Sequence, residues 1–275
     1  MRKWNVLLRD EQTTTCFDRN FRDFFRGADP HSRCVILKAL TTEGGLLEKY
    51  ETFVVEYMQQ DIPLLSPEDI ESILNVVLKM KRREEIESVM DIVGTRLLPL
   101  LPQCKRSTLI RTLQCCGAFQ INDSELIQRV LATLEDQCVG QHSHGVNLNA
   151  AQLFTLLNAI EKLNISSEKS AEQLVIFSFM SIRRQLGVLS IQQVAEAARL
   201  AVSLEMGFTV YISDIVTKLL EFRDTNKNPQ VAEAVVAVCS VYRVEAPQPM
   251  VINKLRKQKI RTEPRRTGPR SDNLR

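Results

Sequence analysis

Aromatic and turn-forming residues are scarce in this sequence. Phe, Tyr and Trp make up 6% of the 275 residues, and there are only ten glycines and ten prolines. A β-sandwich or β-barrel needs frequent turns and draws on aromatic side chains for its strands, so this composition argues against both. Leu, Ala, Glu, Gln, Lys and Arg dominate instead, and these residues favour helices. The composition therefore predicts an all-α protein.

Long apolar runs are also missing. No run reaches the roughly 18 residues that indicate a membrane-spanning helix, so we expect no membrane span. The first residues, MRKWNVLLRD, lack the apolar core of a secretory signal. Basic residues there leave two interpretations open for the N-terminal segment, residues 1–27: a short mitochondrial presequence, or a frayed and partly basic N-terminus.

The seven cysteines show no pairing pattern. Their number is odd, no two have C-x-x-C spacing, and most fall at small apolar positions of helical patterns. We interpret them as reduced core residues in an intracellular compartment. Cys138, His142 and His144 form a cluster of metal-binding type, but a structural zinc site needs a fourth ligand and none is adjacent. A polar loop is the favoured interpretation, and no metal or other cofactor is expected.

Catalytic motifs are absent as well. None of the three histidines is embedded in a nucleophile or zincin motif, and there is no glycine-rich phosphate loop. Adjacent acids such as Glu84 and Glu85 fall in expected first turns of helices, where acidic residues are favoured without any catalytic role. We therefore expect a protein that is not an enzyme and has no small-molecule substrate.

The sequence does contain a repeated apolar grid. The segments LNAAQLFTLLNAIEKL (148–163) and LSIQQVAEAARLAVSL (189–204) both carry apolar residues at offsets 5, 8, 9, 12 and 15. Offsets 5, 8, 9 and 12 form one stripe on a helix of 3.6 residues per turn. Copies of the grid start at residues 28, 65, 101, 148, 189 and 226. Two copies carry a charged residue at offset 5, namely Arg33 and Arg106.

A second amphipathic segment follows each of the first five grid copies. The copies start 37, 36, 47, 41 and 37 residues apart, and the longest interval contains a loop-like insertion, CVGQHSHGVN. One helical hairpin of this length cannot cover its own apolar stripe, so consecutive hairpins must stack. We predict a right-handed α-solenoid of about six helical hairpins, with a period of about 37 residues, over residues 28–250.

This pattern resembles the organellar helical-repeat families, which include octotricopeptide, heptatricopeptide and FAST-kinase-like repeats. The resemblance rests on first helices patterned like LSPEDIESILNVVLKM (65–80) and covers residues 28–250. It implies a mitochondrial matrix location and a part in RNA metabolism, as for the divergent solenoids of trypanosomatid RNA-editing accessory complexes and mitoribosomes. The partners it implies are RNA and the other protein subunits of a mitochondrial ribonucleoprotein complex.

Positive charge is distributed unevenly. Residues 254–275 contain nine Lys or Arg and two acids, a net charge of +7, so the whole-chain value of +3 leaves −4 for the rest. We expect residues 251–275 to form a basic, largely disordered tail that binds RNA phosphates. Within the repeats, basic residues cluster at 79–83 and 105–111, which we expect to form one ridge. The candidate RNA-binding residues are Lys79, Lys81, Arg82, Arg83, Lys105, Arg106, Arg111, Lys254, Arg256, Lys257, Lys259, Arg261, Arg265 and Arg266.

Two functions remain open at this point. In the first, the chain is a non-catalytic subunit of a mitochondrial RNA-processing or RNA-editing complex that binds RNA and scaffolds partner proteins. In the alternative, it is a protein–protein scaffold, or a structural subunit of a mitoribosome or another large mitochondrial complex, without RNA specificity of its own. The basic tail favours the first function, whereas the acidic body favours the alternative.

Overall fold

The computed structural model describes residues 11–42, 46–140, 148–221 and 228–245. These residues form twelve α-helices and two 3₁₀ helices and contain no β-strand, so the all-α prediction is confirmed for them. The α-helices are α2 (Glu11–Gly27), α3 (Pro30–Thr42), α4 (Leu46–Asp61), α5 (Pro67–Val77), α6 (Arg83–Leu97), α7 (Arg106–Phe119), α8 (Ser124–Val139), α9 (Ala150–Leu163), α10 (Lys169–Gln185), α11 (Ile191–Ser203), α12 (Val210–Leu220) and α13 (Pro229–Tyr242). The 3₁₀ helices are η1 (Ile62–Leu64) and η2 (Leu98–Gln103).

The helices follow the expected alternation of two helix types. Each of the six grid copies contains one helix (α3, α5, α7, α9, α11 or α13), and the five second segments correspond to α4, α6, α8, α10 and α12. The grid also predicts which side chains are buried. In α9, for example, Leu153, Leu156, Leu157 and Ile160 are all fully buried.

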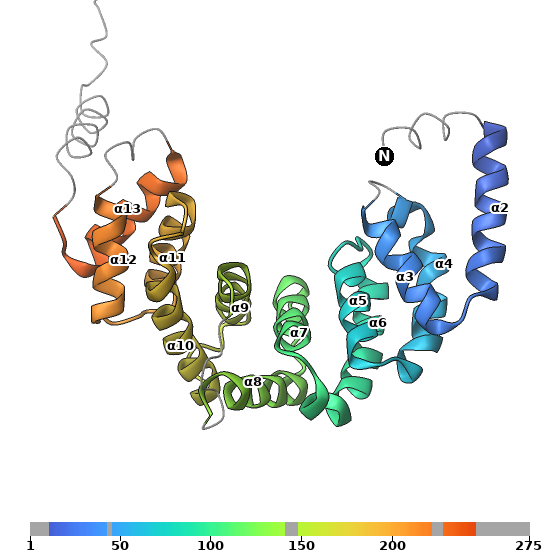
Figure 1. The fold of residues 1–275 in the computed structure, drawn as a ribbon, viewed down its shortest axis with the longest axis horizontal. Coiled ribbons are helices and arrows are strands. Elements are labelled where there is room, and N and C mark those ends of the chain that lie inside the picture. The colour runs from blue at the N-terminus through green and yellow to red at the C-terminus, as the bar shows by residue number, and fades with distance from the viewer. Residues whose placement is uncertain (1–10, 43–45, 141–147, 222–227, 246–275) are drawn as a thin grey trace, which may run out of the picture. The chain divides into compact units, whose positions relative to one another are not determined.

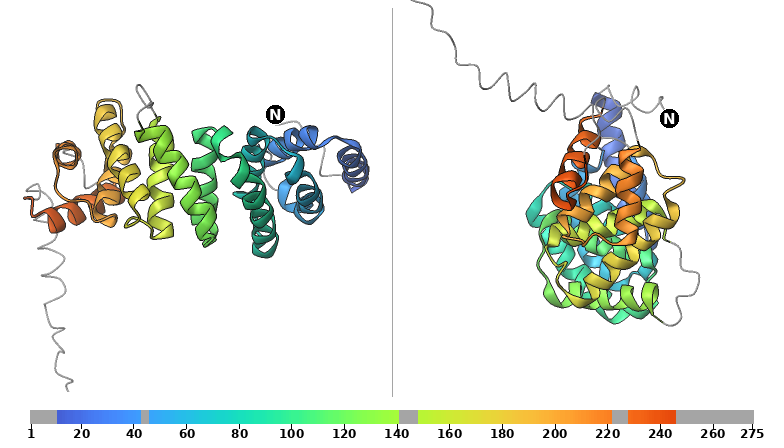
Figure 2. Two further views of the ribbon diagram at one scale, coloured as in Figure 1. Left: turned by 90° about the horizontal axis from the view of Figure 1, so that it is seen from below. Right: turned by 90° about the vertical axis from the view of Figure 1, so that its left-hand side faces the viewer.

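The chain divides into two compact units, residues 1–178 and 179–275, with the boundary inside α10. In the first unit, α3, α5, α7 and α9 pack side by side in sequence order, and α4 packs against α6 (Figures 1 and 2). Gly117 lets α7 approach α9 closely, since a Cβ at this position would lie 3.2 Å from the carbonyl oxygen of Ala159. In the second unit, α11 packs against α12 and α13.

Helix α2 lies within the segment that the sequence assigns to an N-terminal extension. Its Phe21 ring packs on Tyr50 of α4, with 4.4 Å between the ring centroids, and Phe25 is fully buried. Phe21 and Phe25 are four residues apart and so share one face of the helix. The apolar grid does not predict this helix, because none of its copies begins within residues 11–27.

From α7 onward, the first helix of each hairpin ends in the same kind of turn. Gln120, Asn164 and Arg243 are C-caps with positive φ, and after α11 the residue with positive φ is Glu205. The amide N–H groups of Ile121, Ile165 and Met206 then donate to carbonyl groups five residues earlier, as in a Schellman motif. The chain thus makes the same turn repeatedly without a glycine at the left-handed position.

Two further features concern the described part of the chain. None of its helices is both long enough and apolar enough to cross a membrane. The cysteines whose side chains are described form no disulfide; they are Cys34, Cys104, Cys115, Cys116, Cys138 and Cys239.

Candidate nucleic-acid interface

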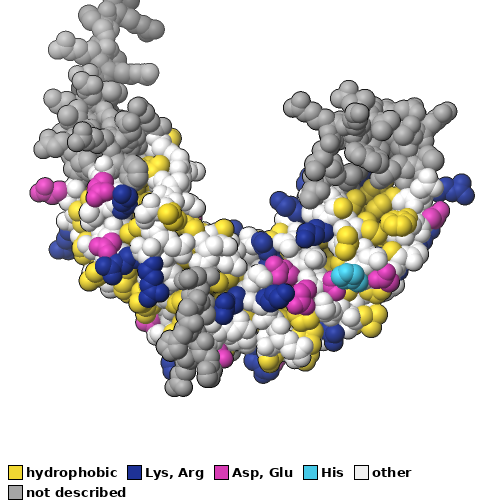
Figure 3. Space-filling model, in the orientation of Figure 1, with side chains coloured by type: hydrophobic (Ala, Val, Ile, Leu, Met, Phe, Trp, Pro, Cys, Tyr) yellow, Lys and Arg dark blue, Asp and Glu magenta, His cyan; other side chains and the backbone are white. Residues whose placement is uncertain are grey.

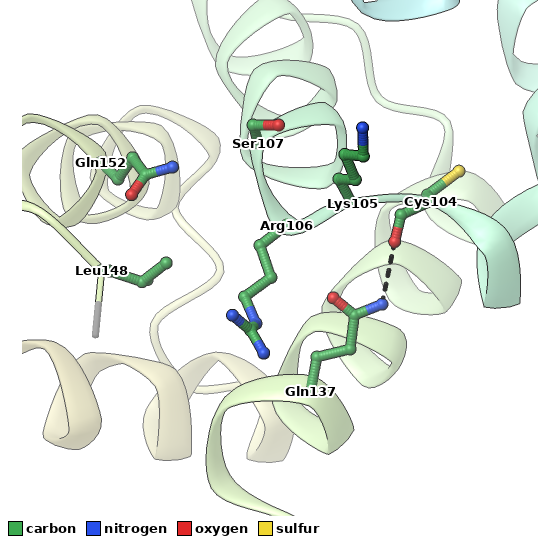
Figure 4. Close-up of a pocket in the computed structure, with 7 residues that line it drawn as sticks. All are labelled: Cys104, Lys105, Arg106, Ser107, Gln137, Leu148 and Gln152. Atoms are coloured by element: carbon green, nitrogen blue, oxygen red, sulfur yellow. Dashed lines mark hydrogen bonds between the residues drawn. The ribbon is translucent and has the colours of Figure 1, made fainter. Parts of the chain in front are cut away.

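Two of the predicted basic residues, Lys105 and Arg106, line a pocket in the first unit (Figure 4). The pocket has a volume of about 480 Å³, within the roughly 300–1,000 Å³ that is usual for ligand sites. Its walls come from the start of α7, the end of α8 and the start of α9. The lining residues are Cys104, Lys105, Arg106, Ser107, Gln137, Leu148 and Gln152.

The side chain of Arg106 carries a positive charge that the pocket does not neutralise. Its Nε is buried and has no hydrogen-bond partner, and none of the lining residues is acidic. Burial raises the pKa of the Cys104 thiol to about 11. It also raises the pKa of the neighbouring Cys138 to about 11, although the Arg106 charge acts in the opposite direction. Both thiols are therefore protonated at neutral pH and do not offset the guanidinium.

The same grid position is occupied quite differently in the first hairpin. Arg33, like Arg106, lies five residues after its grid start, but its Nη1 contacts both carboxylate oxygens of Asp61 at 2.8 and 2.9 Å. Its Nε and Nη2 donate to the carbonyl oxygens of Phe25 and Arg26, each at 3.0 Å. Asp61 is the last residue of α4, so the second helix supplies the counter-ion for Arg33.

In the third hairpin the corresponding helix end provides no carboxylate to the pocket. Gln137, in the last turn of α8, donates from Nε2 to the carbonyl oxygen of Cys104 at 3.0 Å (Figure 4). Gln152, from the start of α9, forms a capping box with Asn149. A buried side-chain nitrogen without a hydrogen-bond partner, such as the Nε of Arg106, is unusual in proteins.

The start of α7 has the polarity that suits an anion. Its N-cap is Lys105, whose side chain makes no cap hydrogen bond, whereas Ser66 and Ser190 cap α5 and α11. A helix N-terminus carries partial positive charge on its backbone N–H groups. The hydroxyls of Ser107 and Thr108, also in the first turn of α7, donate to Glu71 of α5.

Apart from Arg106, the predicted basic residues of the repeats mostly form ion pairs or hydrogen bonds with other side chains. Lys81 contacts Glu48 at 2.6 Å, Arg82 contacts Glu85 at 3.2 Å, and Arg83 contacts Glu87 at 2.7 Å. Lys105 contacts Glu68 at 3.2 Å. Arg111 donates to Gln114, and Lys79 is exposed. These surface ion pairs are weak enough for a polyanion to compete with the carboxylates.

Lys105 and the basic cluster at residues 79–83 lie at opposite ends of α5. Lys105 pairs with Glu68 in the first turn of α5, whereas residues 79–83 follow the last turn of that helix. The 11 residues of α5 separate them by about 16 Å along the helix axis. The turn at 79–83 is held instead by the buried Glu51, which accepts the backbone N–H groups of Lys81 and Arg82. On the face drawn in Figure 3, Lys and Arg are interspersed with Asp and Glu.

Several residues singled out in the sequence lie outside the described residues. They are the seven tail candidates between residues 254 and 266, together with His142 and His144 of the metal-like cluster. Cys138, the third member of that cluster, is buried. In the described part of the chain, no three Cys, His, Asp or Glu residues lie together as metal ligands would.

The charged residues of the pocket can be predicted from the sequence, but Gln137, Gln152 and Leu148 were not predicted as its neighbours. The signal that was available is the break in the grid, because an arginine at offset 5 occupies a position that the α9 and α11 copies fill with buried Leu153 and Val194. The break marks Arg106 as exceptional, but it does not reveal which side chains surround it.

Comparisons with known proteins identify relatives of the chain. A family described as the mitochondrial 3' processome subunit 2 C-terminal domain matches residues 1–265. The chain is 36% identical over 232 residues to a protein of Trypanosoma brucei brucei named mitochondrial 3' processome subunit 2. That match covers 84% of this chain and 14% of the relative's length. No solved structure matches. The chain belongs to the family of mitochondrial 3' processome subunit 2 C-terminal domains.

Proposed function

We propose that this chain is a non-catalytic helical-repeat subunit of a mitochondrial RNA-processing complex, located in the matrix, that contacts RNA phosphates and scaffolds partner proteins. The name of the Trypanosoma relative supports the mitochondrial setting, the RNA-processing role and the membership of a complex. The observation that carries the RNA contact is the Arg106 side chain, whose buried Nε has no hydrogen-bond partner, in a pocket without an acidic lining residue.

The repeat architecture is part of this proposal. Residues 28–250 form a right-handed α-solenoid of about six hairpins, and its extended surface suits contact with several partners. The side-by-side packing of α3, α5, α7 and α9, and of α11 and α13, supports stacking of successive hairpins. Contacts such as Glu71 with Ser107, 36 residues apart, join equivalent positions of neighbouring hairpins.

A phosphate group suits the Arg106 pocket chemically. A guanidinium presents paired N–H donors that match phosphate oxygens, and the start of α7 adds partial positive charge. The exposed Lys105 lies beside Arg106, and phosphate would compete with Glu68 for its ammonium group. These contacts address the backbone and not the bases, so this site binds RNA without regard to sequence.

The test compares Arg106→Met with Arg129→Met, a control that removes an exposed arginine from the middle of α8. Binding of the purified full chain to a labelled 20-nucleotide single-stranded RNA is measured across a salt series. We expect Arg106→Met to weaken binding about tenfold at low salt and to reduce the salt slope by about one, as loss of one phosphate contact does. The control should leave both quantities unchanged. Absence of RNA binding by the unaltered chain at low salt would overturn the RNA role and leave the scaffold.

Protein docking is the second candidate function, and exposed apolar side chains favour it. Leu64 is 71% exposed and Phe24 is 67% exposed. We expect a tagged chain purified from nuclease-treated mitochondria to retain partner proteins if it is a scaffold. Loss of every partner on nuclease treatment would show that RNA alone holds the chain in its complex.

A further inference from the structure

A second cavity lies within the second unit, between the C-terminal turns of α10 and the first turn of α12. Its volume is about 240 Å³, and Met180, Arg183, Arg184 and Tyr211 line it. This is below the roughly 300–1,000 Å³ of pockets that enclose drug-sized ligands. The space therefore suits one planar ring system better than an extended ligand.

The walls of the cavity combine an aromatic ring, a thioether and guanidinium groups. Tyr211 is half-buried, so that part of its side chain is accessible, and Met180 is 42% exposed although it is apolar. Met is flexible and polarizable, and it packs readily against aromatic rings. A flat aromatic ligand would cover both side chains at once.

The two arginines have different roles. Arg183 pairs through Nε with Asp214 of α12, which links α10 to α12 beside the cavity. Arg184 is exposed and has no carboxylate partner among the side chains that the structure describes. One positive charge at the rim of the cavity is therefore available to an anion.

The turn that begins α12 also holds a polar group without a partner. Thr209 is the N-cap residue, but its hydroxyl makes no cap hydrogen bond, and its Oγ1 is buried without any partner. Tyr211 follows two residues later, in the first turn of the helix. The N-cap hydroxyl two residues before Tyr211 therefore has no internal hydrogen-bond partner.

These observations together favour one class of ligand. An aliphatic side chain of a partner protein would cover Met180 but make no use of the charge of Arg184, and an acidic side chain would make no use of the ring. A nucleotide offers both a flat base and a phosphate, and single-stranded RNA is recognised by stacking of unpaired bases on aromatic rings and arginine planes.

We propose that this cavity, the Tyr211 pocket, holds one unpaired nucleobase of single-stranded RNA, stacked on Tyr211 with its phosphate at Arg184. The inference rests on the proposed RNA role and deepens it, since it adds a base contact to the phosphate contact at Arg106. Stacking accepts any base, so the pocket selects single strands over duplexes and not one sequence over another.

The test uses the full chain with Tyr211→Leu, Tyr211→Phe and Arg184→Gln, each checked for folding by its thermal unfolding midpoint. Tyr211→Leu should weaken binding to a 20-nucleotide single-stranded RNA about tenfold, because it removes the stacking face. Tyr211→Phe keeps the ring and should bind as the unaltered chain does. Binding to duplex RNA should be the same for the unaltered chain and Tyr211→Leu, whereas Arg184→Gln should weaken binding to both RNAs.

A second measurement uses the unaltered chain alone. Photocrosslinking of the unaltered chain to RNA that contains 4-thiouridine should attach it to the peptide that includes Tyr211. Full RNA binding by Tyr211→Leu, with no crosslink at this peptide, would overturn the pocket proposal while the RNA role stands. No binding of any RNA by the unaltered chain would overturn both. Loss of partner proteins by Tyr211→Leu with RNA binding intact would assign the pocket to a protein side chain instead.

Discussion

Arg33 and Arg106 occupy the same position of two hairpins, yet their surroundings differ. Arg33 has Asp61 at the end of the following helix and two carbonyl acceptors as well. Arg106 shares its pocket with Gln137 and lies near the protonated thiol of Cys138, and its Nε has no partner. The position of a residue within the repeat therefore does not by itself determine the role of that residue. The same side chain stabilises the fold where the next helix supplies an acid, and it is available to a ligand where the next helix does not.

The largest effect on the free energy of unfolding is expected when the acid of the first hairpin is removed. The side chains of Arg33 and Asp61 are only 14% and 9% exposed. Asp61→Asn leaves a buried arginine without its counter-ion, so we expect the free energy of unfolding to fall by about 3 kcal/mol. Urea titration measures this change. Glu68→Gln, which removes the acid of an exposed pair, is the matched control, and its effect should stay within about 0.5 kcal/mol. An equally small effect of Asp61→Asn would mean that the Arg33 pair is not structural.

The second change removes the unpaired charge. Arg106→Met keeps much of the side-chain volume and abolishes an unsatisfied buried donor, whose burial costs about 1–3 kcal/mol. We expect the free energy of unfolding to rise by about 1 kcal/mol, together with the loss of RNA affinity described above. A destabilisation as large as that of Asp61→Asn would contradict the account, because it would show that Arg106 is held by a structural partner.

The third change gives the third hairpin an acid at the end of its second helix, as the first hairpin has. Gln137→Glu places a carboxylate at the end of α8, where it can reach Arg106 as Asp61 reaches Arg33. The variant gives up the hydrogen bond from Gln137 to Cys104, so the expected net gain in the free energy of unfolding is only about 0.5 kcal/mol. RNA affinity should fall toward that of Arg106→Met, because the guanidinium now has an internal partner. Unchanged RNA binding, measured in the same salt series, would show that the pocket is not the phosphate site.

The smallest effect is expected at the exposed neighbour of Arg106. Lys105→Gln breaks the surface pair with Glu68, and we expect the free energy of unfolding to change by less than about 0.5 kcal/mol. RNA affinity should fall slightly and uniformly across RNA sequences, as for a peripheral phosphate contact. A loss larger than that of Arg106→Met would move the centre of the site from the pocket to its rim.

Much of the fold follows from the sequence because the apolar grid repeats. The stripe at offsets 5, 8, 9 and 12 places a helix at each copy, and the same residues are buried, as in α9 and α11. Helix α2 was missed because its buried face is made of Phe21 and Phe25, which match no copy of the grid. The left-handed turns at Gln120 and Glu205 could not be predicted, since neither residue type favours positive φ.

The candidate sites could be predicted only in part, because the surroundings of each charged residue come from distant segments of the sequence. The sequence shows that Arg106 interrupts an apolar stripe, but the missing acid is a property of the end of α8, 31 residues later. Likewise the consecutive residues Arg183 and Arg184 stand out in the sequence by their charge. Only the packing of α10 beside the start of α12 brings Tyr211 close to them. Charge can be read from one segment, but the partner of a charge depends on which segments the fold places together.

The measurement that tests the central claim most directly is the thermal unfolding of the full chain and of Arg106→Met with added inorganic phosphate, at matched ionic strength with chloride. If the Arg106 pocket binds phosphate, phosphate at about ten times its Kd should raise the midpoint of the unaltered chain by roughly 3–6 °C. The midpoint of Arg106→Met should not move. Equal rises in both proteins, or no rise in either, would contradict the claim that Arg106 awaits a phosphate.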